Sequence, residues 1–396
     1  MRLRPSRSTL SNLGLLVLSV ALTVAALELA ARVVRPPRAE GGLYLYTEHD
    51  PQLGWRKRPA ARARFRMPEY TLDVAINSHG LRDPERSYDA PRGTCRLLAL
   101  GDSFTEAFTV KQEEGVTQRL ESRLAVRGPR RVEVINAGTG GYSTDQEYLF
   151  YTNEGRKYAA HVVGLLFFYN DVTANASQQK IKPRFVIVDG ALSLTNVPVP
   201  PRAWPTAPPS DADAPRGSAA LAWLEARLRT GAPRSYNALA AYGLWEPIEP
   251  ARTRSDFRVY QRHDTPEVDE AWRLTEALLR ALHGAVEVDG ARFFVAYIPN
   301  KIEVSDRDWE LTSLKYGWAP GKAVRGRVAR RLQRICERLG IPLLDLTPSL
   351  VAADRGLLGG PYFREDMHWN ALGHETAAAA LQQFLETQGW LQGCGT

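Results

Sequence analysis

Five almost continuous apolar segments, separated by helix-like segments, most constrain the fold of this chain. They are RLLAL at 96–100, VEVIN at 132–136, VVGLLFFY at 162–169, ARFFVAYIP at 291–299 and IPLLDL at 341–346. A strand that is apolar on both faces must be covered on both faces, and helices on either side of a parallel sheet provide that cover. The sequence therefore predicts an α/β protein, a three-layer α/β/α sandwich with a central parallel sheet.

Composition excludes several classes of protein. With 44% hydrophobic residues among 396, the chain can build a large core and is not a disordered protein. The net charge of +7 comes from scattered residues without a basic run, so we expect no nucleic-acid partner. Cys95, Cys336 and Cys394 lack CxxC spacing and indicate neither a zinc ribbon nor a disulfide framework. Cys336 lies in a helix-like run and is predicted to be a partly buried, unreactive thiol.

The first 35 residues have the pattern of a membrane anchor. Arg2, Arg4 and Arg7 precede Thr9–Leu27, an uncharged segment about as long as a helix needs to cross a bilayer. We predict an uncleaved N-terminal transmembrane helix within 1–35, with a cleaved signal peptide as the alternative. Because arginines that precede a span stay in the cytoplasm, the rest of the chain is predicted to be extracytoplasmic, in the periplasm or at the cell surface.

Two further regions follow this segment. Residues 36–92 are predicted to be an N-terminal extension that packs on the core, with an exposed strand in TLDVAI at 71–76. Residues 93–390 are predicted to form the α/β domain. An insertion at about 172–264 interrupts the alternation of strands and helices in that domain.

The insertion begins with a hairpin-like segment, FVIVDGALSL, that turns at Asp189-Gly190, and continues into a proline-rich stretch. Two interpretations stay open. The insertion is either a lid or substrate platform, or a surface excursion that only packs on the sheet. The lid interpretation rests on three tryptophans: Trp204, Trp223 and Trp245.

Polar clusters follow the ends of the apolar segments. They are Gly101-Asp102-Ser103, Asn136 with Gly138, Gly140 and Gly141, Tyr169-Asn170-Asp171, and EDMHWNALGHE at 365–375. Ligands of a doubly wound sheet bind at the carboxyl ends of its strands, so we expect these clusters to lie close together.

The residue types in these clusters suit acyl transfer, which needs a nucleophile, an oriented base and donors for an oxyanion. Ser103 is the candidate nucleophile and His368 the candidate general base, because histidine titrates near neutral pH. Asp366 would hold the imidazole in the required tautomer. The backbone N–H groups of Ser103 and Gly141 and the side-chain amide of Asn170 are the candidate oxyanion donors. This chemistry requires no cofactor.

Simpler interpretations accompany each candidate. Ser103 can be a turn residue and Asn170 a helix cap. Gly138 and Gly140 are expected to be turn glycines, and His374 is expected to be structural. A metal site formed by His374 with Asp366 and His368 is the competing chemistry, but the spacing is not the i, i+4 pair of helical zinc ligands, so no metal is predicted.

Taken in order, these blocks resemble the SGNH, or GDSL, hydrolase superfamily. The resemblance covers about 95–388 and implies a flavodoxin-like sheet, with Ser103, Gly141, Asn170, and Asp366 with His368, in the family's four blocks. The N-terminal anchor and the pattern INSHGLRD resemble the membrane-tethered bacterial branch. Some members of the branch that this chain resembles are polysaccharide O-acetyltransferases.

The sequence departs from the family pattern at two positions. The usual acid stands three residues before the histidine, where this chain has Glu365, whereas Asp366 stands two before it. The resemblance to acetyltransferase-like relatives favours Asp366 and leaves Glu365 as the alternative. Tyr169 replaces a glycine that many relatives have before the asparagine.

These observations predict a membrane-anchored, serine-dependent ester hydrolase. Its substrate would be an acyl or acetyl ester of a small molecule, or of a cell-envelope glycan or lipid. The alternative with the same residues is a polysaccharide O-acetyltransferase. The alternative of another class is a non-catalytic, glycan-binding envelope protein. The sequence identifies no protein partner.

Overall fold

The structure is a computed structural model, and the chain divides into two compact units. The first consists of Met1–Arg38 and Pro209–Pro250, and the second of Ala39–Pro208 and Ala251–Thr396. The residues that the structure describes are 7–33, 42–127, 131–179, 181–201, 218–240, 242–243, 245, 256–356 and 359–391. The domain boundaries at 35, 92 and 390 stay predictions.

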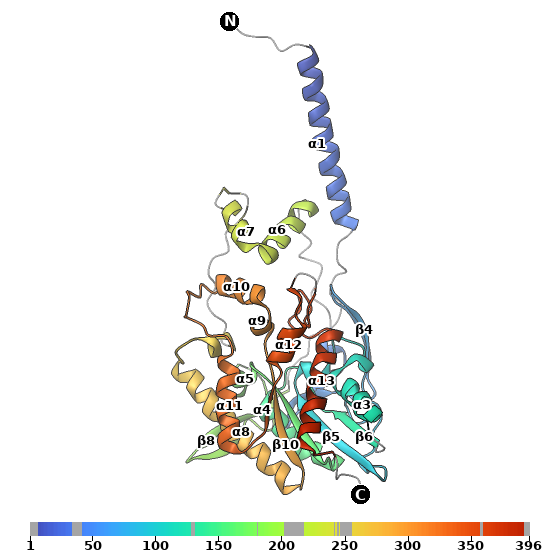
Figure 1. The fold of residues 1–396 in the computed structure, drawn as a ribbon, viewed down its shortest axis with the longest axis vertical. Coiled ribbons are helices and arrows are strands. Elements are labelled where there is room, and N and C mark those ends of the chain that lie inside the picture. Colours follow the sequence, from blue (N-terminus) through green and yellow to red (C-terminus); the bar gives the residue numbers. More distant parts are fainter. Residues whose placement is uncertain are drawn as a thin grey trace. The chain divides into compact units, whose positions relative to one another are not determined.

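A five-stranded parallel sheet forms the centre of the second unit (Figure 1). Its order is β11-β10-β7-β5-β6, and each predicted apolar segment is one of its strands. The strands are β5 (Thr94–Gly101), β6 (Arg131–Asn136), β7 (Val162–Phe168), β10 (Arg292–Ile298) and β11 (Leu343–Asp345). Every residue of β5 and of β7 is buried, as continuous apolar strands require. The predicted parallel sheet is confirmed.

Helices cover both faces of the sheet. Leu97 and Ala99 of β5 face the same space as Leu120 of α3 and Leu381 of α13. Leu98, the residue between them, lies instead against Gly155, just after α4. Since successive side chains of a strand point to opposite faces, α3 and α13 belong to one layer and α4 to the other. The three-layer architecture is therefore confirmed.

The helices of this unit fill these layers and the connections between the strands. Their bounds are α2 (Ser103–Glu106), α3 (Val116–Arg127), α4 (Thr144–Asn153), α5 (Asp171–Asn175), α8 (Pro266–Val288), α9 (Lys301–Val304), α10 (Asp306–Lys315), α11 (Arg327–Leu339), α12 (Thr347–Ala353) and α13 (Ala371–Gln388). Helices α8 and α11 are joined by ion pairs, among them Arg331 with Asp269 and Arg338 with Glu276.

The N-terminal extension consists of two antiparallel hairpins. They are β1 (Thr47–Asp50) with β2 (Gly54–Lys57), and β3 (Arg62–Arg66) with β4 (Thr71–Ala75). Strand β4 is the predicted TLDVAI strand, whereas the other three were not predicted, because charged and short segments hide the alternation of a strand. A small apolar cluster of Tyr46, Ala61, Val74 and Ile76 holds the extension together.

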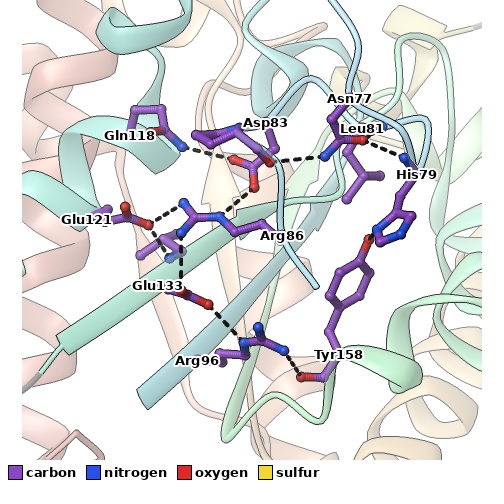
Figure 2. A network of polar contacts seen from close by, with 12 residues as sticks. Asn77, His79, Leu81, Asp83, Arg86, Arg96, Gln118, Glu121, Glu133 and Tyr158 are labelled. Atoms are coloured by element: carbon purple, nitrogen blue, oxygen red, sulfur yellow. Dashed lines mark hydrogen bonds and ion pairs between the residues drawn. The ribbon is translucent and has the colours of Figure 1, made fainter. Parts of the chain in front are cut away.

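A buried polar network links the extension to β5 and β6 (Figure 2). Arg96 of β5 is fully buried and pairs with Glu133 of β6, with 3.0 Å between Nε and Oε2. Arg86 of the extension bonds to Asp83 at 3.1 Å and to Glu121 of α3 at 2.7 Å. The side chain of Asn77, from the INSHGLRD pattern, accepts the backbone N–H groups of residues 79 and 81 and fixes the turn there.

The insertion contains the predicted hairpin. Strands β8 (Arg184–Val188) and β9 (Ala191–Thr195) pair antiparallel, and the turn residues Asp189 and Gly190 have φ of 49° and 81°. Both values are positive, as a two-residue hairpin turn of this type requires. Among the tryptophans of the insertion, Trp245 stacks on Tyr236. Trp204 lies outside the described residues.

The first unit contains α1 (Arg7–Val33), α6 (Ala219–Gly231) and α7 (Pro233–Ala240). The Glu28 carboxylate of α1 accepts hydrogen bonds from the Ser218 hydroxyl and from the first N–H groups of α6. The large apolar side chains of α1 from Leu15 to Leu29 are exposed. Within the described part of the chain, no helix combines the length and the apolar character that crossing a membrane demands. The predicted transmembrane helix is therefore not supported.

The cysteines differ from the expectation in one respect. Cys95 is disulfide-bonded, although the cysteine spacing gave no sign of a disulfide. A disulfide depends on the separation of two residues in the fold, which spacing along the chain does not reveal. Cys336 is free and buried, as predicted, and burial raises the pKa of its thiol to about 12. Cys394 lies outside the described residues.

The buried network predicts a large loss of stability when Arg96 is removed. Arg96→Ala removes the buried cation that pairs with Glu133 and donates to the backbone carbonyls of residues 87 and 158. We therefore expect the free energy of unfolding to fall by about 3 to 5 kcal/mol. Urea unfolding followed by tryptophan fluorescence measures the change. Arg64→Ala, which removes an exposed pair with Asp73, is the control and should leave the midpoint nearly unchanged. Equal midpoints for the two variants would contradict the prediction.

Candidate active site

The predicted nucleophile stands on a sharp turn between a strand and a helix. Strand β5 ends at Gly101, and Ser103 is the first residue of α2. Gly101 has a φ of +153°, and a Cβ there would lie 2.1 Å from the Thr105 hydroxyl oxygen, so the turn requires glycine. The Asp102 carboxylate accepts the N–H of Phe104 at 2.9 Å and caps the helix. The turn residues therefore place Ser103 at the carboxyl end of the sheet.

A chain of hydrogen bonds joins Ser103, His368 and Asp366. The His368 Nε2 atom lies 2.8 Å from the Ser103 hydroxyl oxygen, and its Nδ1 atom lies 2.5 Å from Asp366 Oδ1. An ionised carboxylate can only accept, so Nδ1 carries a proton, and in the neutral form of the imidazole Nε2 is then the atom that accepts from the serine. The rings of Phe104 and Phe108, at centroid distances of 4.9 and 5.0 Å, enclose the imidazole.

Asp366 is ionised at neutral pH. Burial alone would raise the pKa of this carboxyl, but the hydrogen bonds and the charge of His368, with a hydrogen bond from Tyr70, lower the pKa to about 2. The hydroxyl of Tyr70 donates to Asp366 Oδ2 at 2.9 Å. The carboxylate is thus an anion held on both of its oxygens.

Glu365 and His374 lie outside the hydrogen-bonded chain of Ser103, His368 and Asp366. The backbone N–H of Glu365 donates to Glu69, and no hydrogen bond joins Glu365 to His368 within the described residues. His374 lies on α13 and is buried, with its ring 5.4 Å from that of Trp369. Burial, then the charge of Arg82, lowers the pKa of His374 to about 3, so this side chain is neutral at physiological pH.

The glycine loop after β6 lies beside the end of β5. The N–H of Thr139 donates to the Gly101 carbonyl at 2.9 Å. Two of the loop's N–H groups bond within the protein, that of Gly138 to Asn136 Oδ1 and that of Gly140 to Glu106 Oε2. Gly138 and Gly140 therefore have the structural role that the sequence predicted for them. Gly141 follows with a φ of +81°.

Asn170 follows β7, the other neighbour of β5. It stands at the N-cap position of α5, but its side chain makes no capping hydrogen bond. Its Oδ1 atom is buried and has no hydrogen-bond partner within the described residues. Tyr169, the preceding residue, packs against Phe257 and Tyr260 and bonds to Asp256 at 3.2 Å. Ser103, the glycine loop and Asn170 thus follow three adjacent strands at one edge of the sheet.

Residues of the extension, which sequence reasoning did not connect with the site, support the glycine loop. The buried Lys57 ammonium donates to the Thr139 hydroxyl at 2.8 Å and to the Gly138 carbonyl, and burial lowers the pKa of Lys57 to about 8. The Trp55 indole donates to the Gly140 carbonyl at 3.0 Å. No local motif marks these contacts, because their partners lie more than 80 positions away in the sequence.

Two further residues hold the nucleophile turn. The Glu106 carboxylate, one helical turn after Ser103, accepts the Tyr46 hydroxyl as well as the Gly140 N–H. The Arg82 guanidinium of the INSHGLRD pattern donates to the carbonyls of residues 106, 107 and 110, at the end of α2. Glu106 stands three residues after Ser103, so the sequence alone could have indicated that Glu106 lies beside the nucleophile turn.

A hollow of about 590 Å³ lies beside Tyr70 and Phe363. Its other lining residues include Lys111 and Arg355, whereas Ser103 and His368 do not line it. The hollow is therefore separate from the hydrogen-bonded chain of Ser103, His368 and Asp366.

Models of two families match consecutive parts of the chain. The GDSL-like Lipase/Acylhydrolase family matches residues 99–258, and the SGNH hydrolase-like domain of the acetyltransferase AlgX matches residues 257–396. The first match contains Ser103 and Asn170, and the second contains Asp366 and His368. Both matched parts contribute strands to the five-stranded sheet.

Several solved structures are also similar. A variant of the acetyl-xylooligosaccharide esterase Axe2 from Geobacillus Stearmophilus is 14% identical, with 76% of this chain and 97% of that chain covered and a TM-score of 0.38. The lipase/acylhydrolase from Enterococcus faecalis is 12% identical, with 74% and 96% covered and a TM-score of 0.36. A GDSL-like lipase from Bacteroides thetaiotaomicron is 11% identical, with 74% and 88% covered and a TM-score of 0.34. No curated protein sequence matches this one.

Proposed function

We propose that this chain cleaves or transfers an acyl ester through Ser103. The proposal starts from its SGNH/GDSL hydrolase-type enzyme domain over residues 99–396. The observation that carries the proposal is the 2.8 Å contact between Ser103 and an imidazole whose other nitrogen bonds to an ionised carboxylate. This arrangement activates a hydroxyl that is otherwise a weak nucleophile.

The first half of the reaction forms an acyl-enzyme. The Ser103 oxygen attacks the ester carbonyl while its proton passes to His368 Nε2. Asp366 stabilises the imidazolium that results. The tetrahedral intermediate then expels the alcohol, which takes the proton from His368, and the acyl group stays on Ser103. Asp366 rather than Glu365 has the orienting role in the proposal, because Asp366 bonds to the imidazole and no hydrogen bond of the described residues joins Glu365 to it.

The negative charge that develops on the carbonyl oxygen needs hydrogen-bond donors that stabilise it. The backbone N–H groups of Ser103 and Gly141 and the side-chain amide of Asn170 have this role in the proposal. Its support is that all three follow neighbouring strands and that the Asn170 side chain makes no cap hydrogen bond.

The second half of the reaction decides between hydrolysis and transfer. If water attacks the acyl-enzyme with His368 as base, the product is a free acid. If a sugar hydroxyl attacks instead, the acyl group moves to the sugar. We favour an acyl or acetyl ester of a cell-envelope glycan or lipid as substrate. The family matches support both outcomes, because one is a lipase/acylhydrolase family and the other is named for an acetyltransferase.

We also propose that residues 1–35 tether the protein to a membrane and that the remainder is extracytoplasmic. Three arginines precede the uncharged segment Thr9–Leu27. The large apolar side chains of α1 are exposed and would be covered by lipid. The disulfide of Cys95 suits an oxidising compartment.

The proposed chemistry predicts that turnover depends on Ser103. The purified full-length chain is incubated with an activated acetyl ester and a panel of envelope oligosaccharides, and mass spectrometry follows the acetyl group. Free acetate that the sugars do not change indicates an esterase, whereas acetylated sugar indicates a transferase. Ser103→Ala should abolish either product. Equal turnover by this variant and the wild type would remove the proposed nucleophile, whereas no turnover by either protein would favour a non-catalytic glycan-binding protein.

The oxyanion assignment predicts a large effect of Asn170→Ala. Loss of one oxyanion donor lowers kcat by about 100- to 1000-fold and changes KM little. Steady-state kinetics with the activated ester measure both constants. Asn153→Ala, which removes an exposed asparagine from the end of α4, is the matched control and should keep normal rates. Full activity of Asn170→Ala would show that the side chain is not a donor.

The proposed location predicts where protease can reach the α/β domain. Protease added outside spheroplasts of cells that make the protein should digest the domain, and the protein should sediment with membranes. Deletion of residues 1–35 should release it from that fraction. A domain that is digested only after lysis would place it in the cytoplasm and contradict the proposal.

A further inference from the structure

The turn between β3 and β4 contacts the segment that carries Asp366. Three successive backbone N–H groups, those of Arg364, Glu365 and Asp366, donate to the Glu69 carboxylate at 2.7, 2.8 and 2.9 Å. The next residue of the turn, Tyr70, donates its hydroxyl to Asp366 Oδ2 at 2.9 Å. Both contacts join residues that are nearly 300 positions apart in the chain.

The segment around Asp366 needs this support. Residues 364–367 form bends between α12 and α13, without helical or sheet hydrogen bonds of their own. The side chain of Asp366 accepts the His368 N–H at 3.0 Å, and the Phe363 N–H donates to the His368 carbonyl at 3.1 Å. Glu69 gathers the three N–H groups on one carboxylate, and Phe363 packs on the ring of Tyr70 at 5.0 Å. The backbone and one carboxylate oxygen of Asp366 are thus held from outside the segment.

We propose that Glu69 and Tyr70 are positioning residues that aim Asp366 Oδ1 at His368. This inference rests on the proposed function, in which Asp366 orients the imidazole. Tyr70 occupies Oδ2, so that Oδ1 is the oxygen presented to Nδ1. Glu69 fixes the backbone from which that side chain extends. In this proposal both residues act through Asp366.

Residues that only stabilised the fold would leave the electrostatic interaction between Asp366 and His368 unchanged. Tyr70 changes this interaction directly, because its hydroxyl bonds to the Asp366 carboxylate. Without its hydroxyl, Asp366 keeps more negative charge on the oxygen that faces the imidazole, and the imidazolium becomes more stable. His368 would then stay protonated, and inactive as a base, to a higher pH. The acid limb of the kcat/KM profile should therefore move to higher pH in Tyr70→Phe.

The groups around the pair include two aromatic rings, a second histidine and two further carboxylates. The rings against His368 are those of Phe104 and Phe108, which carry no charge. His374 lies on α13 and remains neutral, as its lowered pKa requires. Glu69 accepts the Asp366 N–H and Glu365 precedes Asp366 in the chain, and Tyr70→Phe changes neither carboxylate.

The first experiment is proton NMR of the Nδ1–H group of His368, which is shifted far downfield by its bond to a carboxylate. The resonance is assigned by its loss in His368→Ala. In Glu69→Gln one acceptor oxygen becomes an NH₂ group, so at least one of the three N–H groups loses its acceptor. We expect the resonance to move upfield and to exchange faster with water. This measurement needs no turnover, so its result is independent of the substrate and of the proposed reaction.

The second experiment uses the activated acetyl ester. We expect kcat of Glu69→Gln to fall about tenfold with KM within about twofold, since outer contacts that orient a site typically have effects of this size. For Tyr70→Phe we expect the acid limb to rise by about half a pH unit, a threefold change in proton affinity. Asp73→Asn, an exposed position on the same hairpin, is the matched control and should match the wild type in both experiments.

The outcomes separate the two proposals. An unchanged Nδ1 resonance in Glu69→Gln, together with an unchanged acid limb in Tyr70→Phe, would overturn the positioning role, even if both variants were less stable. Absence of Ser103-dependent turnover in the wild type would overturn the proposed function, and the NMR result would still decide whether Glu69 holds the pair.

Discussion

The hydrogen bond between His368 and Ser103 joins residues that are 265 positions apart, and the rest of the architecture makes this contact available. Parallel strands bring their carboxyl ends to one edge of the sheet, which places Ser103, the glycine loop and Asn170 side by side. His368 comes from the other half of the chain, after β11. Both family matches contribute strands to the same sheet, and neither matched part contains a complete site.

The strands and most of the candidate site could be predicted because both depend on local chemistry. Continuous apolar runs require cover on two faces, and polar residues directly after such runs lie at the functional edge. The choice between Asp366 and Glu365 could not be made from residue types, because it depends on which side chain reaches Nδ1. The contacts of Trp55 and Tyr70 were not predicted, since a side chain's long-range partner leaves no pattern in the sequence.

The fate of the proposed acyl-enzyme would be a competition between water and a bound acceptor. Every group proposed for the first half of the reaction also serves the second, so the residues around Ser103 do not by themselves select hydrolysis or transfer. Selection requires an acceptor hydroxyl held close to the acyl carbon while water is kept away. Two closely related chemistries can therefore share the proposed arrangement of Ser103, His368 and Asp366.

The extension contributes to the site through the geometry of one peptide bond. The carbonyl of Gly140 and the N–H of Gly141 belong to the same trans peptide and point in opposite directions. The indole of Trp55 donates to that carbonyl, and the N–H of Gly140 is held by Glu106, so the peptide has little freedom to rotate. The direction of the Gly141 N–H is consequently set by a residue of β2. The extension thus constrains the Gly141 N–H, a proposed oxyanion donor, at one end of the candidate site and Asp366 at the other.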